Sequence, residues 1–276
     1  DHRDLPSFPT RRSSDLVVDP SRRFADPAYY LNIAVGLEPD APREPLPPLS
    51  AFRSQRATTE LLTPEALATA DALVISGIIG IQPSDVRRID EYLQSGGGAI
   101  WFLGGSDGAI DPATANAFFE RLGIRIEGID AADDLGSVFR IAHYDPQTEP
   151  FKMFADIAPD EPKRLTFQRR LRLSVAQSGG DYWLAQRLAD FNDGLPAFLA
   201  FPVGSGRLYV CASAPAPDWS DLHRSRLFVP IMQSMLNACA RPASAGSSFF
   251  SGDPLPDGFA GDAVNLETGE RATLDR

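Results

Sequence analysis

The stretch GGSDG at residues 104–108 contains the first residue types whose spacing could support catalysis. It follows an apolar run and loosely matches the Gly-x-Ser-x-Gly turn that presents the nucleophilic serine of many hydrolases. Such a serine needs a base within hydrogen-bond reach, so His143 or His223 would have to activate Ser106. The dipeptide Asp-Pro at 111–112 starts a new helix soon afterwards, which indicates a loose loop instead of a sharp strand-to-helix turn. The sequence therefore favours a non-catalytic Ser106, with hydrolysis as the alternative.

A second candidate site is the string formed by Asp218, Trp219, Ser220 and Asp221. Two carboxylates beside an indole suit a sugar or an amine ligand, and either carboxylate could orient the base of the hydrolase alternative. In the structural interpretation, which we expect, Ser220 or Asp221 caps the turn into the closing helix and Trp219 packs over the sheet edge. The candidate ligand-binding residues are Ser106, Asp218, Trp219 and Asp221.

Metal and phosphate sites are not predicted. Asp130, Asp133 and Asp134 could hold Ca²⁺ through oxygen atoms, but their spacing matches no EF-hand loop, and we expect an exposed acidic turn. The three histidines of the chain form no cluster in the sequence. The glycines at 96–98 precede a strand, so they cannot present helix N-terminal amides to a phosphate. We expect neither a metal nor a cofactor.

The composition is that of a globular chain with 276 residues, of which 43% are hydrophobic and 23% charged. The net charge of −11 argues against binding to nucleic acid or to an anionic membrane surface. Basic pairs at 87–88 and 169–170 are expected to be solvated edges of a helix or a strand. Cys211 and Cys239 are expected to be buried free thiols, with a disulfide between them as the alternative.

Strands and helices that would position these residues alternate in the first half of the chain. The run ALVIS at 72–76 is a continuous apolar strand of the kind that is covered on both faces in parallel sheets. A helix that begins at Pro83 and ends at the glycines at 96–98 precedes a second apolar strand at 99–103. Another helix follows from 111–112. This order predicts an α/β fold with a doubly wound, mainly parallel sheet.

The second half of the chain predicts an antiparallel C-terminal meander beside that sheet. Its strands are expected at 182–188, 195–203 and 207–212, with a turn at 192–194. A helix over 228–240 closes the domain. The residues of this helix that are expected to face inward are Val229, Met232, Met235 and Leu236.

Three parts are expected along the chain. Residues 1–16 show neither helical nor strand periodicity, and residues 7–16 resemble the translation of a DNA-sequencing adapter, so this part is expected to be an artefact. Residues 17–242 form the α/β domain. Residues 243–276 form a linker rich in Pro, Gly and Ser and the start of a truncated β-rich segment. We therefore expect natural segments to be missing at both ends.

Five stretches within residues 17–242 occur together in one known family. They are ALVISG at 72–77, LQSGGGAIWFLGG at 93–105, GSGRLYV at 204–210, DWSDL at 218–222 and LFVPI at 227–231. In this order and spacing they resemble the BatA-like, or aerotolerance-type, bacterial membrane proteins. The resemblance implies an extracytoplasmic domain similar to class I glutamine amidotransferases, with a flavodoxin-like sheet, in a protein that has N-terminal transmembrane helices.

The resemblance also implies that the domain is catalytically silent. Active amidotransferases carry a cysteine on the turn after the corresponding strand, whereas residues 104–108 contain none. Their partner histidine has no counterpart near the end of the domain except His223. We therefore expect a non-catalytic interaction or scaffold domain that faces the periplasm or cell exterior and is anchored in the inner membrane only by missing upstream helices. Its expected partners are other membrane or periplasmic proteins, and the alternative is a serine hydrolase or sugar-binding domain of the same fold.

Overall fold

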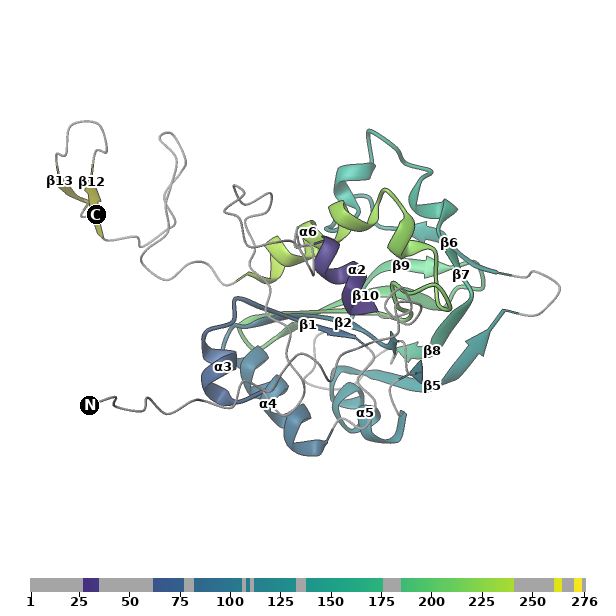
Figure 1. Cartoon of the computed structure of the whole chain (residues 1–276), viewed down its shortest axis with the longest axis horizontal. Helices are drawn as coiled ribbons and strands as arrows, with labels where there is room; N and C mark the ends of the chain where they lie inside the picture. Colours follow the sequence, from purple (N-terminus) through teal and green to yellow (C-terminus); the bar gives the residue numbers. More distant parts are fainter. Residues whose placement is uncertain are drawn as a thin grey trace, which may run out of the picture.

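A central seven-stranded sheet with helices on both faces forms the core of the computed structural model (Figure 1). The helices are α2 (Pro27–Ala34), α3 (Pro64–Ala68), α4 (Pro83–Gln94), α5 (Pro112–Phe119) and α6 (Phe228–Cys239). In Figure 1, α3, α4 and α5 lie on one face of the sheet, and α2 and α6 lie on the other. The structure describes residues 27–34, 62–76, 82–105, 108–109, 112–132, 138–175, 185–240, 261–264 and 271–274. The predicted α/β class is confirmed.

The sheet combines a parallel and an antiparallel part. In spatial order its strands are β1 (Ala72–Ser76), β2 (Gly98–Phe102), β11 (Gly206–Cys211), β10 (Pro196–Val203), β9 (Gln186–Phe191), β6 (Phe139–Tyr144) and β7 (Thr166–Phe167). β1, β2 and β11 are parallel neighbours, and each pair from β11 to β7 is antiparallel. Five strands (β1, β2, β11, β9 and β7) therefore run in one direction, and β10 and β6 run in the other. The predicted antiparallel meander is confirmed, and it continues the parallel strands because β11 pairs directly with β2.

Helix α4 forms where its sequence pattern predicts. At its N-terminus, the Gln82 N–H donates to the Asp85 carboxylate at 3.1 Å as part of a capping box. Its buried apolar residues are Val86, Ile89, Tyr92 and Leu93. Strand β2 is buried along its whole length. Strand β1 is only half-buried except at Ile75, so the full coverage expected for residues 72–76 is not observed.

Glycines between α4 and β2 let helices from both faces pack against the backbone. A Cβ added to Gly97 would lie 2.3 Å from the Tyr92 ring of α4, and one added to Gly98 would lie 2.2 Å from the Cys239 carbonyl of α6. Both distances are far below a van der Waals contact, so a side chain at Gly97 would displace the Tyr92 ring, and one at Gly98 would displace the backbone of α6. Gly96 has a φ of 97°, the left-handed conformation with which a glycine ends a helix.

A two-stranded antiparallel sheet that the sequence analysis does not predict lies beside α5 (Figure 1). It pairs β5 (Ile124–Ala131) with β8 (Arg169–Val175). Its buried residues are Ile124, Ile126, Leu171, Leu173 and Arg170. The apolar members recur at every second position, as in a strand with one face against the core. The ends of these two strands border the candidate site.

Helix α6 packs on β2 and β11. Its buried residues are Phe228, Ile231, Met232, Met235, Leu236 and Cys239. Val229 is 38% exposed, so its predicted inward orientation is wrong. The buried residues of α6 start at Phe228 and follow at intervals of three to four residues. Val229, one position after Phe228, therefore faces solvent. Among the described residues, no helix combines the length and the apolar character needed to cross a lipid bilayer.

Both cysteines are free and buried, as predicted. Burial raises the pKa of Cys211 to about 12 and that of Cys239 to about 12. The Cys239 thiol donates to the carbonyl of Ala99 at 3.6 Å. The alternative of a disulfide is therefore not observed.

Several short elements complete the fold. They are β3 (Gly104–Gly105), β4 (Gly108–Ala109), η3 (Glu120–Leu122), η4 (Lys152–Phe154), η5 (Pro162–Arg164), η6 (Leu222–Arg224), β12 (Gly261–Val264) and β13 (Arg271–Leu274). The last two strands form an antiparallel hairpin within the segment expected to be β-rich. The suspected artefact at 1–16 and the expected linker at 243–260 lie outside the described residues.

Candidate functional site

The parallel strands β1, β2 and β11 end at one edge of the sheet, and the candidate residues follow these ends in the sequence. Open α/β sheets bind ligands at this edge. The short strand β3 continues from β2 there, and the loop at 212–221 follows β11. Ser106 comes directly after β3 but lies outside the described residues.

Trp219 covers the backbone at the end of β2. A Cβ added to Gly104 would lie 2.5 Å from Cε3 of the indole, so the ring lies directly against this glycine. The indole Nε1 donates to the carbonyl of Gly105 at 2.9 Å, and the residue is only 2% exposed. The predicted packing of Trp219 is confirmed, and a ring so deeply buried cannot offer its face to a sugar or an amine.

Hydrogen bonds hold the loop that carries Trp219 in place. The Ser220 hydroxyl donates to the carbonyl of Ala214 at 2.6 Å, and the Ser213 hydroxyl donates to that of Arg169 at 2.7 Å. The carbonyl of Trp219 accepts the backbone N–H of Gln168 at 2.8 Å and that of Arg169 at 3.1 Å. Both serines are buried, so these bonds are shielded from water. The loop is therefore a fixed part of the fold.

Asp221 joins the loop to strand β7. One carboxylate oxygen accepts the backbone N–H of Thr166 at 2.9 Å, and the other accepts its hydroxyl at 2.7 Å. No side-chain cap is present at η6 or at α6, so the prediction that Asp221 caps the turn into the closing helix is wrong. The Asp221 carboxylate bonds to Thr166 instead of the helix start because Thr166 offers two donors, one for each carboxylate oxygen. Ser220 accepts the N–H of Leu222 at 3.4 Å, which is a weak version of the predicted cap.

Among the described residues, neither histidine is bonded to a candidate nucleophile. His143 lies on β6, four strands away from β2, which corresponds to about 19 Å across the sheet. The Nδ1 of His223 lies 2.8 Å from the carbonyl of Ser220, and its ring packs against Tyr30 of α2 with the centroids 4.4 Å apart. Burial lowers the pKa of His223. In the described part of the chain, no hydrogen bond joins either imidazole to a serine hydroxyl or a thiol.

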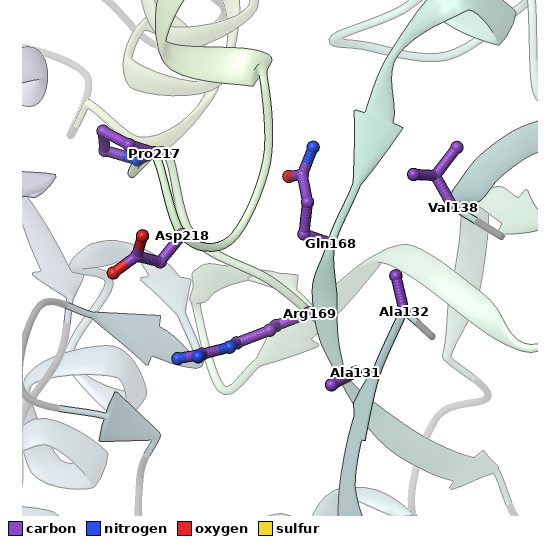
Figure 2. Close-up of a pocket in the computed structure, with 7 residues that line it drawn as sticks. All are labelled: Ala131, Ala132, Val138, Gln168, Arg169, Pro217 and Asp218. Atoms are coloured by element: carbon purple, nitrogen blue, oxygen red, sulfur yellow. The ribbon is translucent and has the colours of Figure 1, made fainter. Parts of the chain in front are cut away.

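Asp218 is the candidate residue that faces open space. It lies at a surface cavity of about 450 Å³ beside the loop (Figure 2). The cavity is lined by Ala131, Ala132, Val138, Gln168, Arg169, Pro217 and Asp218. A smaller cavity of about 310 Å³ is lined by Glu161, Arg164, Leu165, Asp221, Arg224 and Ser225. The two carboxylates of the DWSD string therefore do not act as a pair, because Asp221 is bonded to Thr166 and lines a different cavity.

A cluster of ion pairs around the buried Arg170 is not predicted from the sequence. This residue is 2% exposed, so the prediction that the pair at 169–170 is a solvated edge is wrong for Arg170. Its guanidinium donates to Asp193 at 2.7 Å and to Asp130 at 3.2 Å. The hydrogen bond from Arg170 lowers the pKa of Asp193. Asp130 also pairs with Arg172 at 3.1 Å, so it is not part of the exposed acidic turn that was expected.

Two aromatic rings explain why this arginine is buried. The guanidinium carbon of Arg170 lies 3.9 Å from the ring centre of Phe139 and 4.8 Å from that of Phe191. The alternation in β8 places Arg170 on the face opposite Leu171, which from the sequence alone looks like a solvated face.

Asp133 and Asp134 lie outside the described residues, and within those residues no group of three or more potential metal ligands is present.

Comparisons with known proteins support the architecture alone. No protein-family model and no curated protein sequence matches the chain. Among solved structures, the cytoplasmic protein STM1381 of Salmonella typhimurium LT2 is similar with a TM-score of 0.53 and 16% identity, over 77% of this chain and 87% of that one. The cytoplasmic protein STM3548 of Salmonella typhimurium has a TM-score of 0.48 and 18% identity, over 65% and 75%. An exo-β-1,4-mannosidase of Opitutaceae bacterium strain TAV5 has a TM-score of 0.38 and 18% identity, over 63% and 26%.

Proposed function

We propose that this chain is a non-catalytic interaction or scaffold domain of a larger, membrane-anchored bacterial protein of the BatA-like type. Its finer fold in this proposal is that of class I glutamine amidotransferases, with a flavodoxin-like sheet, and its location is the periplasmic or outer side of the inner membrane. The observation that carries the non-catalytic part is the position of Trp219 against Gly104 at the end of β2.

The backbone at this strand end is already paired within the protein. The Gly104 N–H donates to the carbonyl of Ser213 at 3.4 Å, and the Gly104 carbonyl accepts the hydroxyl of Ser76 at 3.2 Å. The Gly105 carbonyl accepts the indole N–H of Trp219. A hydrolase of this fold needs an open turn and free N–H groups to bind the developing oxyanion. In this proposal, the indole of Trp219 leaves no space for a substrate against the backbone of Gly104.

The proposed partners are other membrane or periplasmic proteins. The net charge of −11 disfavours nucleic acid and anionic lipid surfaces as binding partners. In this proposal the domain approaches the membrane only through upstream helices that are not part of the sequence. The likeness to STM1381 supports the α/β architecture but bears on neither the partners nor the location.

Two measurements test this proposal. The full-length protein should fractionate with the inner membrane, and protease added from the periplasmic side should cleave the domain. The same protein should hydrolyse p-nitrophenyl esters and glutamine no faster than its Ser106→Ala variant. A full-length protein that stays in the cytosol would overturn the anchored location, and hydrolysis that depends on Ser106 would overturn the non-catalytic role.

A further inference from the structure

The larger cavity beside the Trp219 loop has the make-up of a binding site for a small charged molecule. It has a volume of about 450 Å³ and lies between residues 217–218 and the ends of β5 and β8 (Figure 2). Sites for small ligands have volumes from about 300 Å³ and combine apolar walls with a few polar groups. Here the walls come from Ala131, Ala132, Val138 and Pro217, and the polar groups come from Gln168, Arg169 and Asp218.

Arg169 and Asp218 bring opposite charges to this cavity without forming an ion pair. In the part of the chain that the structure describes, neither side chain forms an ion pair or a hydrogen bond. The neighbouring Arg170, in contrast, is paired with two aspartates. Figure 2 shows the guanidinium and the carboxylate extending into the same open space. A free guanidinium favours a carboxylate, and a free carboxylate favours an ammonium group.

Gln168 adds a buried acceptor that has no partner. Its side-chain Oε1 is shielded from solvent and forms no hydrogen bond within the described structure. Its backbone is already occupied, because its N–H donates to Trp219 and its carbonyl accepts the N–H of Ala132 at 2.7 Å. Buried polar atoms are nearly always paired in native proteins, so an unpaired acceptor in the wall of this cavity is unusual.

We propose that this cavity binds a small zwitterion, namely an amino acid or a short peptide. The ligand carboxylate pairs with Arg169, and its ammonium group pairs with Asp218. A neutral sugar would leave both charges unpaired, so a charged ligand fits the lining better. This inference goes beyond the scaffold role and does not depend on it, because neither Arg169 nor Asp218 closes the end of β2.

Isothermal titration of the whole chain with glycine and with alanyl-alanine tests the proposal. We expect saturable binding of at least one of the two zwitterions at concentrations up to about 10 mM. N-acetyl-alanyl-alanine, which lacks the ammonium group, and alanyl-alanine amide, which lacks the carboxylate, should each bind at least about tenfold more weakly, as expected when one charged hydrogen bond is lost.

Variants locate the binding site. Arg169→Gln and Asp218→Asn should each weaken binding by about tenfold, with unchanged melting temperatures. The matched controls Arg87→Gln and Asp156→Asn change exposed side chains elsewhere and should bind as the wild type does. The proposal is overturned if neither zwitterion binds saturably, if the capped analogues bind equally well, or if the cavity variants bind like the controls. The comparison with capped analogues uses wild-type protein, so it tests whether both charges of the ligand are recognised even if a variant does not fold.

Discussion

Replacing Gly104 by alanine should force Trp219 from its position at the end of β2. The new Cβ would lie 2.5, 2.6 and 2.7 Å from ring atoms Cε3, Cδ2 and Cζ3, about 1 Å closer than carbon atoms pack. The ring must therefore move, and its Nε1 loses the Gly105 carbonyl, which it contacts at 2.9 Å. Overpacking costs about 1–3 kcal/mol and a lost buried hydrogen bond about 1 kcal/mol more, so Gly104→Ala should lower the free energy of unfolding by about 3 kcal/mol.

A double-mutant cycle isolates this contact. Trp219→Ala removes a buried indole and should cost about 3–5 kcal/mol. Once the ring is gone, Gly104→Ala has no ring to displace, so it should cost about 2 kcal/mol less in that background than in the wild type. Gly128→Ala is the matched control, because its Cβ would meet only the flexible end of Arg172 at 3.2 Å. We expect this control to cost less than about 1 kcal/mol.

Urea-induced unfolding followed by far-ultraviolet circular dichroism gives the free energies of unfolding of all five proteins. We expect a coupling free energy of about 2 kcal/mol between Gly104→Ala and Trp219→Ala. A cost below about 0.5 kcal/mol for Gly104→Ala, or strictly additive costs, would refute it. Either result would mean that the indole does not lie against Gly104.

Three further predictions concern buried charges and thiols. Arg170→Met should lower the free energy of unfolding by about 2–3 kcal/mol in urea, because it removes the charged hydrogen bonds that a guanidinium only 3% exposed makes to Asp130 and Asp193. Arg172→Ala changes a side chain that is 46% exposed and should cost less than about 1 kcal/mol. The pKa of Asp193 is lowered in the folded state by Arg170, so its stabilisation is present above the unfolded pKa of about 4 and is lost as the pH falls through the folded value. Asp193→Asn should therefore flatten the fall in melting temperature below about pH 4. Cys211 and Cys239, whose pKa values burial raises to about 12, should react with a thiol reagent at about pH 8 only after unfolding.

Each of these predictions has a result that contradicts it. Equal costs for the substitutions at Arg170 and Arg172 would show that the guanidinium of Arg170 is solvated. A melting temperature that falls as steeply with pH in Asp193→Asn as in the wild type would remove the assigned ion pair. Rapid labelling of either native cysteine would contradict the burial of the thiols.

Local patterns are sufficient to predict the elements that lie beneath the site. The apolar run at 72–76 matches β1, and the helical spacing after Pro83 matches α4. Thr63 accepts the N–H of Ala66 at 3.2 Å, as expected of a residue before Pro-Glu at a helix start. The strand pattern, the helical spacing and the cap each depend on residues no more than four positions apart, so they can be recognised in the sequence itself.

The interactions that define the site depend on residues far apart in the chain. The indole of Trp219 bonds to Gly105, which is 114 positions away, and Asp221 bonds to Thr166, which is 55 positions away. Nothing in the DWSD string identifies these partners, so a helix cap was expected for Asp221. The burial of Arg170 is hidden for the same reason, because its aromatic neighbours come from other strands.

Strands β5 and β8 could not be predicted from the sequence for a different reason. Among the described strands, β5 and β8 form a sheet only with each other. Their apolar residues alternate over short stretches that contain several arginines. Without the partner strand in view, this alternation resembles a solvated segment. Arg169 is the first residue of β8 and Gln168 directly precedes it, so the candidate binding site could not be predicted without that strand.

Labelling of the chain with a fluorophosphonate probe, read by mass spectrometry at Ser106, tests most directly whether the strand end is catalytically closed. With Trp219 over the preceding backbone, the peptide that contains residue 106 should gain no more label in the wild type than in the Ser106→Ala variant. Stoichiometric labelling of Ser106 that disappears in a His223→Ala variant would demonstrate an activated hydroxyl at this edge and would contradict the non-catalytic role.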